Sequence, residues 1–251
     1  MLLKNKSAII YGAGGSIGGA VARAFAREGA TLFLAGRSLD TLDKVAKEIS
    51  AAGGIAETAQ VDAFDEHSVD EHAAAVAAKA GSIDISFNAI RIKGSTQGTP
   101  LVELSADDIS LPVKSRVATN FLTARSAARH MIQSRSGVIL MITATPARLA
   151  FPMTGSFGVE GAAIEGLCRS LASELSPQGV RVICLRSAGS PESFPETTER
   201  EEIAKMIADG TLLKRAPTLA EVGSVASVMA SDYASPMTAT VANMTCGAIV
   251  D

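Results

Sequence analysis

The sequence of 251 residues contains no tryptophan and only two tyrosines, and its formal net charge is -3. Few aromatic rings leave little surface on which the bases of a nucleic acid could stack. A slightly negative chain also has no electrostatic reason to approach nucleic acid or an anionic membrane. We therefore expect neither nucleic acid nor a membrane among its partners.

Cysteine is also scarce, because the chain holds only Cys168, Cys184 and Cys246. Three widely separated cysteines argue against a disulfide framework and give no support for a metal site. Each lies in an apolar stretch, so we expect buried thiols in a reducing compartment. The first apolar run stops at Gly12 and is too short for a signal-peptide core or a membrane span. A soluble, cytoplasmic protein is therefore expected.

What the chain does contain is a regular alternation of short apolar runs and longer amphipathic ones. Short apolar runs bounded by turn residues are typical of buried strands, and apolar residues spaced three or four apart are typical of helices. We expect strands over residues 7–11, 31–35, 55–61, 83–88, 137–143, 180–185 and 240–245. We expect helices over residues 17–28, 39–51, 68–80, 106–134, 156–175, 201–209 and 219–231.

Strands that alternate with helices and are apolar along their whole length predict a parallel sheet covered on both faces. The expected fold class is α/β, a three-layer Rossmann fold with a doubly wound parallel sheet of about seven strands. No repeat, low-complexity tract or linker divides the sequence, and its length is ordinary for one α/β unit. We therefore expect a single domain over residues 1–251.

A glycine-rich turn follows the first expected strand and opens the first expected helix. Glycines at such a turn let the backbone approach a pyrophosphate, and the helix N-terminus favours its negative charge. A glycine-rich turn alone can be purely structural, but this position between strand and helix favours a dinucleotide-binding site. The residues expected to contact the pyrophosphate are Gly12, Gly14, Gly15, Ser16, Ile17 and Gly18.

The turn resembles that of the short-chain dehydrogenase/reductase family, and the resemblance continues over essentially the whole chain. The family's turn reads Thr-Gly-x-x-x-Gly-x-Gly. Gly12 and Gly18 match its first and last glycines, and Ser16 stands at the middle one. The resemblance implies a protein that binds a nicotinamide dinucleotide, and Ser16 puts the strength of that binding in question because its side chain could crowd the pyrophosphate.

Further matches follow in the family's order. Asp62, which precedes Ala63, resembles the aspartate that contacts the adenine after the third strand. Asn88 and Ala89 resemble the core of the family's Asn-Asn-Ala-Gly motif after the fourth strand. Asn120 resembles the helix asparagine of the family's catalytic tetrad. The resemblance thus adds these residues to the expected cofactor and active site.

Arg37 follows the second expected strand directly after Gly36. An acid at the Gly36 position would bond the 2′-hydroxyl of the adenosine ribose, whereas a guanidinium beside that point suits a 2′-phosphate. In the family, an arginine here usually accompanies NADP. The resemblance therefore implies NADP(H) in preference to NAD(H), and the alternative is a solvated surface arginine.

The resemblance also implies a serine after the fifth strand and a Tyr-x-x-x-Lys pair on the next helix, where the tyrosine exchanges the proton and the lysine lowers its pKa. A gapless alignment anchored on residues 171–175, Leu-Ala-Ser-Glu-Leu, places Phe157 at the tyrosine and Gly161 at the lysine. The usual spacing places Ala144 at the serine. Of the tetrad, only Asn120 keeps its functional group.

Nearby polar residues are tentative substitutes for the missing groups. Thr143 and Thr145 flank Ala144, and their hydroxyls are either donors to a substrate carbonyl or satisfied strand-end groups. Glu160 shares a helix face with Phe157 and is either a base or a carboxylate at the surface or in a dimer interface. The charges of Arg91, Lys93 and Arg148 lie on loops expected to ring the site and either bind an anionic substrate or remain solvated.

Three functions follow from this mixture of matches and losses. The first is an NADP-dependent oxidoreductase that acts on a small carbonyl or alcohol with an altered proton donor. The second is a non-catalytic regulator that uses the nucleotide as a ligand. The third is a non-catalytic partner subunit of a mixed oligomer. The expected ligand is thus a small-molecule substrate or a nucleotide. Members of the family commonly pair their two long helices across a two-fold axis, so the resemblance also implies a homodimer or homotetramer.

Overall fold

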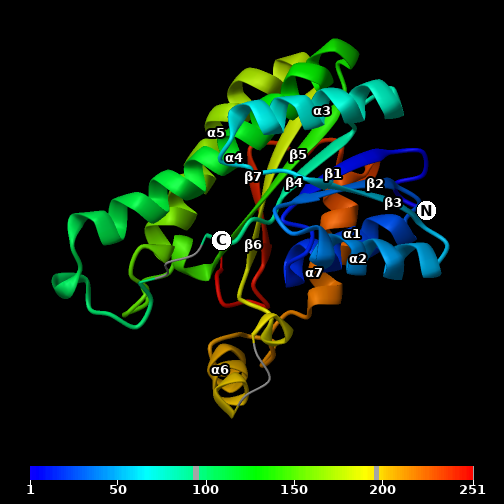
Figure 1. Ribbon diagram of the computed structural model, residues 1–251. Coiled ribbons are helices and arrows are strands. Elements are labelled where there is room, and N and C mark those ends of the chain that lie inside the picture. The colour runs from blue at the N-terminus through cyan, green and yellow to red at the C-terminus, as the bar shows by residue number, and fades with distance from the viewer. Residues whose placement is uncertain (93–95, 195–197, 251) are drawn as a thin grey trace.

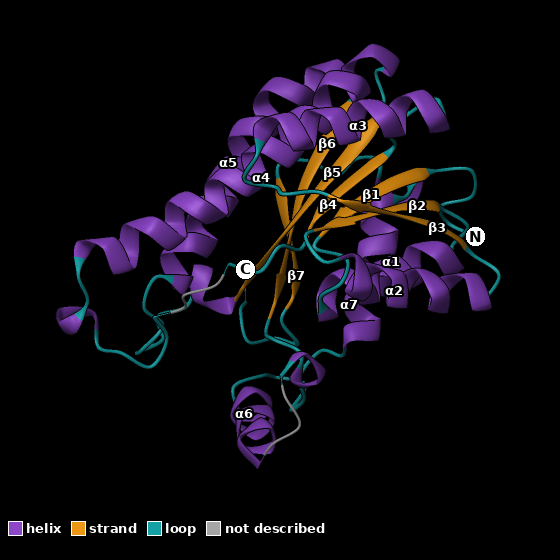
Figure 2. Ribbon diagram, viewed as in Figure 1, coloured by secondary structure: helices purple, strands orange, loops and turns teal. Residues whose placement is uncertain are grey.

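The computed structural model describes residues 1–92, 96–194 and 198–250. Its centre is a seven-stranded sheet in the order β3-β2-β1-β4-β5-β6-β7, in which every neighbouring pair is parallel. The strands are β1 (Ser7–Tyr11), β2 (Thr31–Gly36), β3 (Ile55–Gln60), β4 (Ile85–Asn88), β5 (Gly137–Ala144), β6 (Val180–Ser187) and β7 (Thr240–Met244). The doubly wound parallel sheet predicted from the sequence is confirmed (Figures 1 and 2).

Helices cover both faces of the sheet (Figure 2). One layer consists of α1 (Ser16–Arg27), α2 (Leu39–Ala51) and α7 (Leu219–Ala230). The other consists of α3 (Glu66–Ala80), α4 (Ala106–Ser134) and α5 (Phe157–Leu175). The remaining helix, α6 (Thr198–Asp209), stands away from both layers. All the α-helices and strands that the sequence predicts are present, with ends that differ by a few residues.

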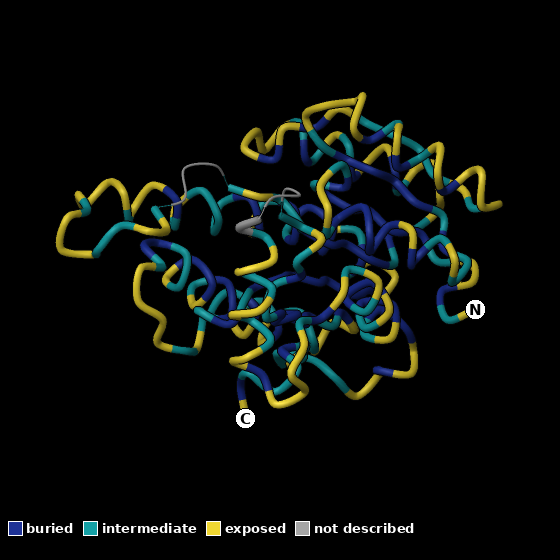
Figure 3. The backbone as a smooth tube through the Cα atoms, turned by 90° about the horizontal axis from the view of Figure 1, so that it is seen from below, coloured by how far each residue is buried: buried dark blue, intermediate teal, exposed yellow. Residues whose placement is uncertain are grey.

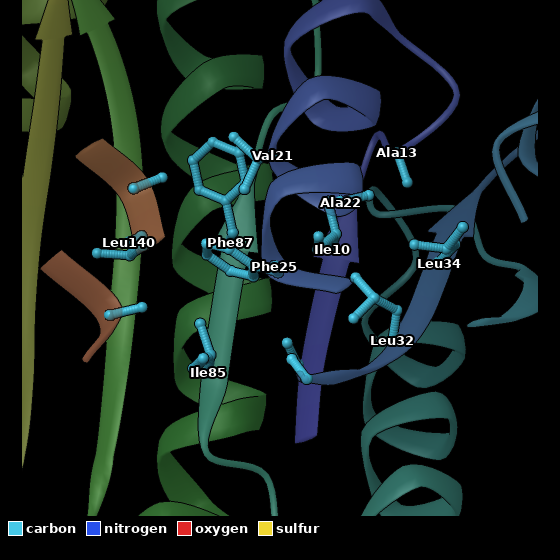
Figure 4. Close-up of a cluster of buried hydrophobic side chains, with 14 of the residues drawn as sticks. Ile10, Ala13, Val21, Ala22, Phe25, Leu32, Leu34, Ile85, Phe87 and Leu140 are labelled. Atoms are coloured by element: carbon cyan, nitrogen blue, oxygen red, sulfur yellow. The ribbon is translucent and has the colours of Figure 1, made fainter. Parts of the chain in front are cut away.

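Two apolar clusters, one on each face of the sheet, hold these layers together. In the first, Phe25 of α1 packs with Ile10 of β1 and Phe87 of β4, and all three are fully buried (Figure 4). Burying one such side chain contributes roughly 1.5–3 kcal/mol. Buried residues, dark blue in Figure 3, run through the interior of the molecule. The central strands β1, β4 and β5 are buried almost throughout, as expected for strands covered on both faces.

Several boundaries differ from the predicted ones for local reasons. Helix α3 begins at Glu66, because the Asp65 carboxylate caps it by accepting the N–H of His67. Strand β6 runs two residues beyond the apolar stretch and includes Arg186. This arginine is buried and forms an ion pair with Glu165. A short 3₁₀ helix, η2 (Thr145–Ala147), follows β5 and was not predicted. These differences all bear on the site.

The cysteine prediction holds for two residues and is wrong for the third. Cys168 and Cys184 are free and buried, whereas Cys246 is partly exposed because it lies in the turn after β7. No group of His, Cys, Asp and Glu side chains suited to a metal ion occurs within the described residues. Among the helices described, none combines the length and the apolar character that crossing a bilayer demands.

Candidate functional site

The turn between β1 and α1 accepts only glycine at two positions. Gly12 has a φ of +77°, and a Cβ there would lie 2.9 Å from the carbonyl carbon of Ala89. A Cβ at Gly18 would overlap the carbonyl oxygen of Gly12. The turn is therefore in direct backbone contact with the segment after β4 and with the first turn of α1. A turn that brings its backbone to a phosphate has this close packing.

The N-terminus of α1 is open to an anion. Its N-cap residue, Gly15, has no side chain to cap the helix, and both Gly15 and Ser16 are exposed, while Ile17 is partly buried. Gly14 packs on α2, where a Cβ would overlap the hydroxyl of Thr41. Uncapped N–H groups and the helix dipole together attract negative charge. These residues fit a pyrophosphate, and the exposed Ser16 does not close the turn.

The expected adenosine contacts lie at the ends of β2 and β3. Arg37 is exposed, and its carbonyl oxygen accepts a hydrogen bond from the side-chain amide of Gln60 at 3.1 Å. Asp62 is also exposed, and its carboxylate accepts the N–H of Phe64 at 3.1 Å. Ala63 is buried between them and the core. The guanidinium of Arg37 thus stands in solvent at the edge where a 2′-phosphate would lie.

Asn88, by contrast, is a brace within the fold. Its amide nitrogen donates to the carbonyl oxygen of Thr119 at 3.1 Å and to the hydroxyl of Thr123 at 3.0 Å. Its amide oxygen accepts the N–H of Ile90 at 3.0 Å. These bonds tie β4 to α4 and fix the segment that includes Ala89. Asn88 therefore shapes the site through the backbone, while its side chain is occupied.

Buried Tyr11, the last residue of β1, forms an aromatic pair with partly buried His72 of α3. The ring of Tyr11 meets that of His72 edge-on, with centroids 5.9 Å apart. Burial lowers the pKa of His72 to about 4, and burial, followed by the charge of Asp70, raises the pKa of Tyr11. The Tyr11 hydroxyl therefore stays protonated inside the core. The Tyr11 hydroxyl therefore cannot replace a catalytic tyrosine, because both its position and its pKa are unsuitable.

Asn120 sits in α4 with its side chain 2% exposed. Its amide nitrogen donates to the carbonyl oxygen of Arg116, one turn earlier, at 2.9 Å. No group in the described part of the chain donates to its Oδ1. The Arg116 guanidinium donates from Nη1 to Ile90 O at 2.9 Å and from Nη2 to Ile142 O at 2.8 Å. A cation thus spans the carboxyl ends of β4 and β5, one helical turn before Asn120.

The end of β5 is occupied by an internal polar network. The Thr143 hydroxyl donates to the Glu165 carboxylate at 3.0 Å. Glu165 in turn accepts two hydrogen bonds from Arg186, at 2.8 and 2.7 Å, and both side chains are almost fully buried. Thr143 is therefore a satisfied strand-end hydroxyl. Ala144 is partly buried and Thr145 is buried.

The first turns of α5 pack tightly on η2. A Cβ at Gly158 would lie 2.9 Å from the carbonyl oxygen of Pro146, and one at Gly161 would lie 2.8 Å from the Cβ of Ala147. Contacts this close leave no room for a larger side chain without a shift of η2. Phe157, one turn before Gly161, is partly buried. The space around the expected lysine position is therefore filled.

Glu160 is buried, with 6% of its surface exposed, which corrects the expectation of a surface carboxylate. The reason is local: its carboxylate accepts the hydroxyl of Ser156 at 2.8 Å, and the backbone N–H of Ser156 donates to the hydroxyl of Thr96 at 2.9 Å. The loop after β4 and the start of α5 close over the carboxylate. Glu160 therefore belongs to the site interior.

The sequence reasoning missed the three charged residues that dominate this interior, Arg116, Glu165 and Arg186. The spacing held one signal for the first, because Arg116 stands four residues before Asn120 and shares its helix face. An arginine directly after the apolar run 180–185 was a signal for the Glu165–Arg186 pair. Among the loop cations, Arg91 and Arg148 are exposed, and Lys93 lies outside the described residues.

A shallow groove of about 360 Å³ lies at the opposite edge of the sheet, where Lys6, Asp84 and Arg181 line it. Arg181 donates to the carbonyl oxygens of Met229 and Ser231, both at 2.9 Å. Its guanidinium therefore ties the end of α7 to β6. Ligands of doubly wound sheets bind outside the carboxyl ends of the strands, so this amino-terminal groove is not the candidate site.

Comparison with known proteins finds relatives over most of the chain. The family model described as enoyl-(acyl carrier protein) reductase matches residues 12–248. The oxidoreductase asL5 of Sarocladium schorii is 30% identical over 242 residues, which cover 94% of this chain and 93% of that protein. The gluconate 5-dehydrogenase of Gluconobacter oxydans is 31% identical over 216 residues, covering 86% and 81%.

The fold has close counterparts among solved structures. The crystal structure of a dehydrogenase/reductase from Sinorhizobium meliloti matches with a TM-score of 0.86 at 23% sequence identity. The match covers 99% of this chain and 96% of that one. The layered architecture is thus shared over the full length, including the elements that carry the candidate site.

Proposed function

The chain belongs to the short-chain dehydrogenase/reductase family, and from that premise we propose that it binds NADP(H) but has lost ordinary carbonyl reductase activity. A nicotinamide dinucleotide is the cofactor that the family implies, and when bound it supplies or accepts a hydride. The turn residues and the open N-terminus of α1 fit its pyrophosphate. The proposed role is that of a nucleotide-binding regulator or of a partner subunit in a mixed oligomer.

The observation that carries the proposal is the packing of α5 on η2. Gly161, which aligns with the family's lysine, packs so closely on η2 that a Cβ there would lie 2.8 Å from the Cβ of Ala147, so a lysine would require η2 to shift. Phe157, which aligns with the tyrosine, has no hydroxyl, and Ala144 has none to polarise a carbonyl. These changes act on one catalytic unit, so their penalties do not add.

The chemical consequence concerns the proton. Reduction of a ketone leaves an alkoxide that must gain a proton as it forms, and a positioned acid contributes about 10²–10⁴-fold to the rate. Thr143 is committed to Glu165, and Asn120 can at most hold a water through its free Oδ1. Turnover should therefore fall by that factor relative to a family member with the complete set of groups.

One observation favours a second candidate, an NADP-dependent oxidoreductase with a substitute proton donor. The Ser156 hydroxyl and the Glu160 carboxylate form a buried pair 2.8 Å apart at the start of α5, within one turn of Phe157. Under this candidate, the Glu160 carboxyl group takes the role of the proton donor. Glu160→Gln then abolishes turnover even when the protein is saturated with NADPH.

The preference for NADP(H) rests on Arg37, which is exposed beside the adenosine end. A hydrogen bond to a charged group is worth about 1.5–3 kcal/mol, which corresponds to about tenfold discrimination or more. The absence of an acid at Gly36 removes the usual partner of a free 2′-hydroxyl. Both features support the same cofactor.

We also propose a homodimer or homotetramer formed through the outer faces of α4 and α5. Phe121 of α4 and Val159 of α5 are large apolar side chains that stand 39% and 48% exposed on these helices. A two-fold axis would bury each patch against its own copy. Light scattering at micromolar concentration should report an oligomer, and a monomer would contradict this part of the proposal.

The test of the proposed function has two steps. Calorimetric titration should give tighter binding of NADPH than of NADH. A panel of ketones and aldehydes should then leave the absorbance of bound NADPH unchanged over minutes. Failure of both nucleotides to bind would refute the cofactor proposal, and rapid oxidation of NADPH by a ketone would favour the second candidate.

A further inference from the structure

Arg116 is placed where a ligand on the carboxyl edge of the sheet would meet it. Its two Nη atoms donate to Ile90 O and Ile142 O, which belong to the segment after β4 and to the end of β5. These bonds fix the plane of the guanidinium across the two strand ends. Ligands of doubly wound sheets bind at this edge, so the cation is held in position before any ligand arrives.

The guanidinium has donors to spare. It carries five N–H groups, and the two carbonyl oxygens use two of them. In the described part of the chain no other acceptor reaches Arg116, and the residue is only partly buried. Beside it, Asn120 is 2% exposed and its Oδ1 has no described donor. Within the described residues, the site therefore combines a guanidinium that has unused donors with a buried acceptor, Asn120 Oδ1, one turn along the same helix.

The local charge decides which ligand suits this pair. Burial lowers the pKa of Arg116, while the negative charge of buried Glu160 acts in the opposite direction and keeps the guanidinium charged. An anionic ligand would meet the attraction of Arg116 together with the repulsion of Glu160. A neutral diol meets neither conflict, because each hydroxyl both accepts and donates. It can accept from Arg116 and donate to Asn120 Oδ1 or to Glu160.

The position of Arg116 along the edge points to one particular diol. Gly12 of the phosphate turn packs on Ala89 and Ile90, and Ile90 O is the acceptor of Arg116. The adenosine end, at Arg37 and β2, lies on the other side of the same turn. A dinucleotide bound across the switch point places its two halves on either side of the turn. Its second ribose would therefore lie toward β4 and β5.

We propose that Arg116, acting from α4 beside Asn120, binds the hydroxyl groups of the nicotinamide-side ribose of the cofactor. This inference rests on the proposed function, since it requires that a dinucleotide binds. It gives the site a cation on α4 in a fold whose α5 has no room for one at Gly161. Arg116 is thus a cofactor-binding residue, and nothing in it moves a proton.

The test compares a whole dinucleotide with its adenosine half. Calorimetry measures the affinities of NADPH and of adenosine 2′,5′-bisphosphate for the unmodified protein and for Arg116→Met and Arg116→Lys. The expected result for Arg116→Met is about a 10- to 100-fold loss for NADPH and no change for the bisphosphate. Arg116→Lys should restore part of the loss. Arg129→Met, an exposed position on the same helix, serves as the matched control and should change neither affinity.

A second measurement needs no variant and covers the case in which Arg116→Met does not fold. An NADP analogue without the 2′-hydroxyl of the nicotinamide-side ribose should bind the unmodified protein more weakly than NADP by a similar factor. Equal affinities for analogue and NADP, or an Arg116→Met variant that loses both ligands equally, would overturn the inference. Absence of binding by both NADPH and the bisphosphate would instead refute the proposed function and the inference with it.

Discussion

The two ends of the sheet's carboxyl edge differ in how open they are to a ligand. At β1 and β2, the turn keeps the glycines that its backbone contacts require, and α1 begins uncapped and exposed. At β5 and β6, the buried ion pair Glu165–Arg186 and the close packing of Gly161 on helix η2 fill the interior, and we propose that the family's catalytic groups are lost there. Cofactor binding and catalysis thus depend on separate parts of the fold, and one can persist without the other.

The difference has a physical reason. A phosphate-binding turn is a set of backbone constraints, and replacing Gly12 or Gly18 would force main chain into main chain. A catalytic tetrad is a set of side chains on an intact frame, and each can be exchanged if the new group packs. At the β5–β6 end of this chain, Glu165 pairs with Arg186 and Gly161 packs on Ala147.

The largest effect is expected from the ion pair at the β5–β6 end. Glu165→Ala leaves the Arg186 guanidinium buried without its bidentate carboxylate, and breaking such a pair costs about 3–5 kcal/mol. Urea unfolding should report this loss in the free energy of unfolding. Glu174→Ala, an exposed glutamate of the same helix, is the control and should change it by less than about 0.5 kcal/mol. A small effect of Glu165→Ala on the free energy of unfolding would mean that the Glu165–Arg186 pair does not stabilise the β5–β6 end.

The β1 end should be the pH-sensitive one. Burial depresses the pKa of His72 to about 4 in the folded state, below the unfolded value of about 6.5. Above pH 6.5 the His72 ring is neutral in both states and does not reduce the free energy of unfolding. As the pH falls from 6.5 toward 4, only the unfolded chain takes up the proton, so the free energy of unfolding decreases. The loss between pH 7 and pH 5 should be about 2 kcal/mol.

His72→Gln should flatten this pH dependence in urea unfolding experiments, since it removes the buried titrating ring. His67→Gln, on the exposed side of the same helix, should leave the dependence unchanged. A pH profile that is the same in both variants would show that the acid sensitivity arises elsewhere.

Rebuilding the catalytic groups should fail for steric reasons before it fails for chemical ones. In the triple variant Ala144→Ser, Phe157→Tyr and Gly161→Lys, the new lysine would collide with Ala147, and overpacking of this kind costs about 1–3 kcal/mol. We expect lower stability and little ketone reduction. Adding Ala147→Gly should relieve the contact, recover the stability and raise the activity. Ketone reduction by the triple variant without Ala147→Gly would show that η2 shifts at little cost to make room for the lysine.

The smallest effect belongs to the adenosine end. Arg37→Ala should weaken NADPH by about tenfold and leave NADH unchanged, because only the 2′-phosphate meets the guanidinium. Calorimetry with both nucleotides measures this directly, and Lys44→Ala on the neighbouring α2 is a suitable control for the loss of one positive charge. Equal affinities of the unmodified protein for NADPH and NADH would refute the role of Arg37.

The sequence predicted the order of strands and helices because its apolar pattern changes period at every boundary. It predicted the phosphate turn because the role of Gly12 and Gly18 is a backbone property that residue type alone reveals. The assignment of Asn120 and of positions 144, 157 and 161 to the catalytic set stays a prediction. These features depend on local pattern and on spacing along the chain.

The polar interior could not be predicted in the same way. Whether Glu160 faces solvent or the site interior depends on Ser156 and on the loop that carries Thr96. Thr96 lies 60 residues before Ser156 in the chain. The pairing of Glu165 with Arg186 joins a helix to a strand across the sheet's edge. Contacts of this kind are set by tertiary packing, and neither periodicity nor composition records them.

The most direct test of the central claim is a single-turnover experiment on the unmodified protein. Protein in excess is saturated with NADPH, binding is verified by titration, and a reactive ketone is added while the absorbance of the reduced nicotinamide is followed. The account predicts full binding with no ketone-dependent oxidation above the rate without protein. Complete oxidation within a second of mixing would contradict it, because the bound cofactor would then have a working proton donor.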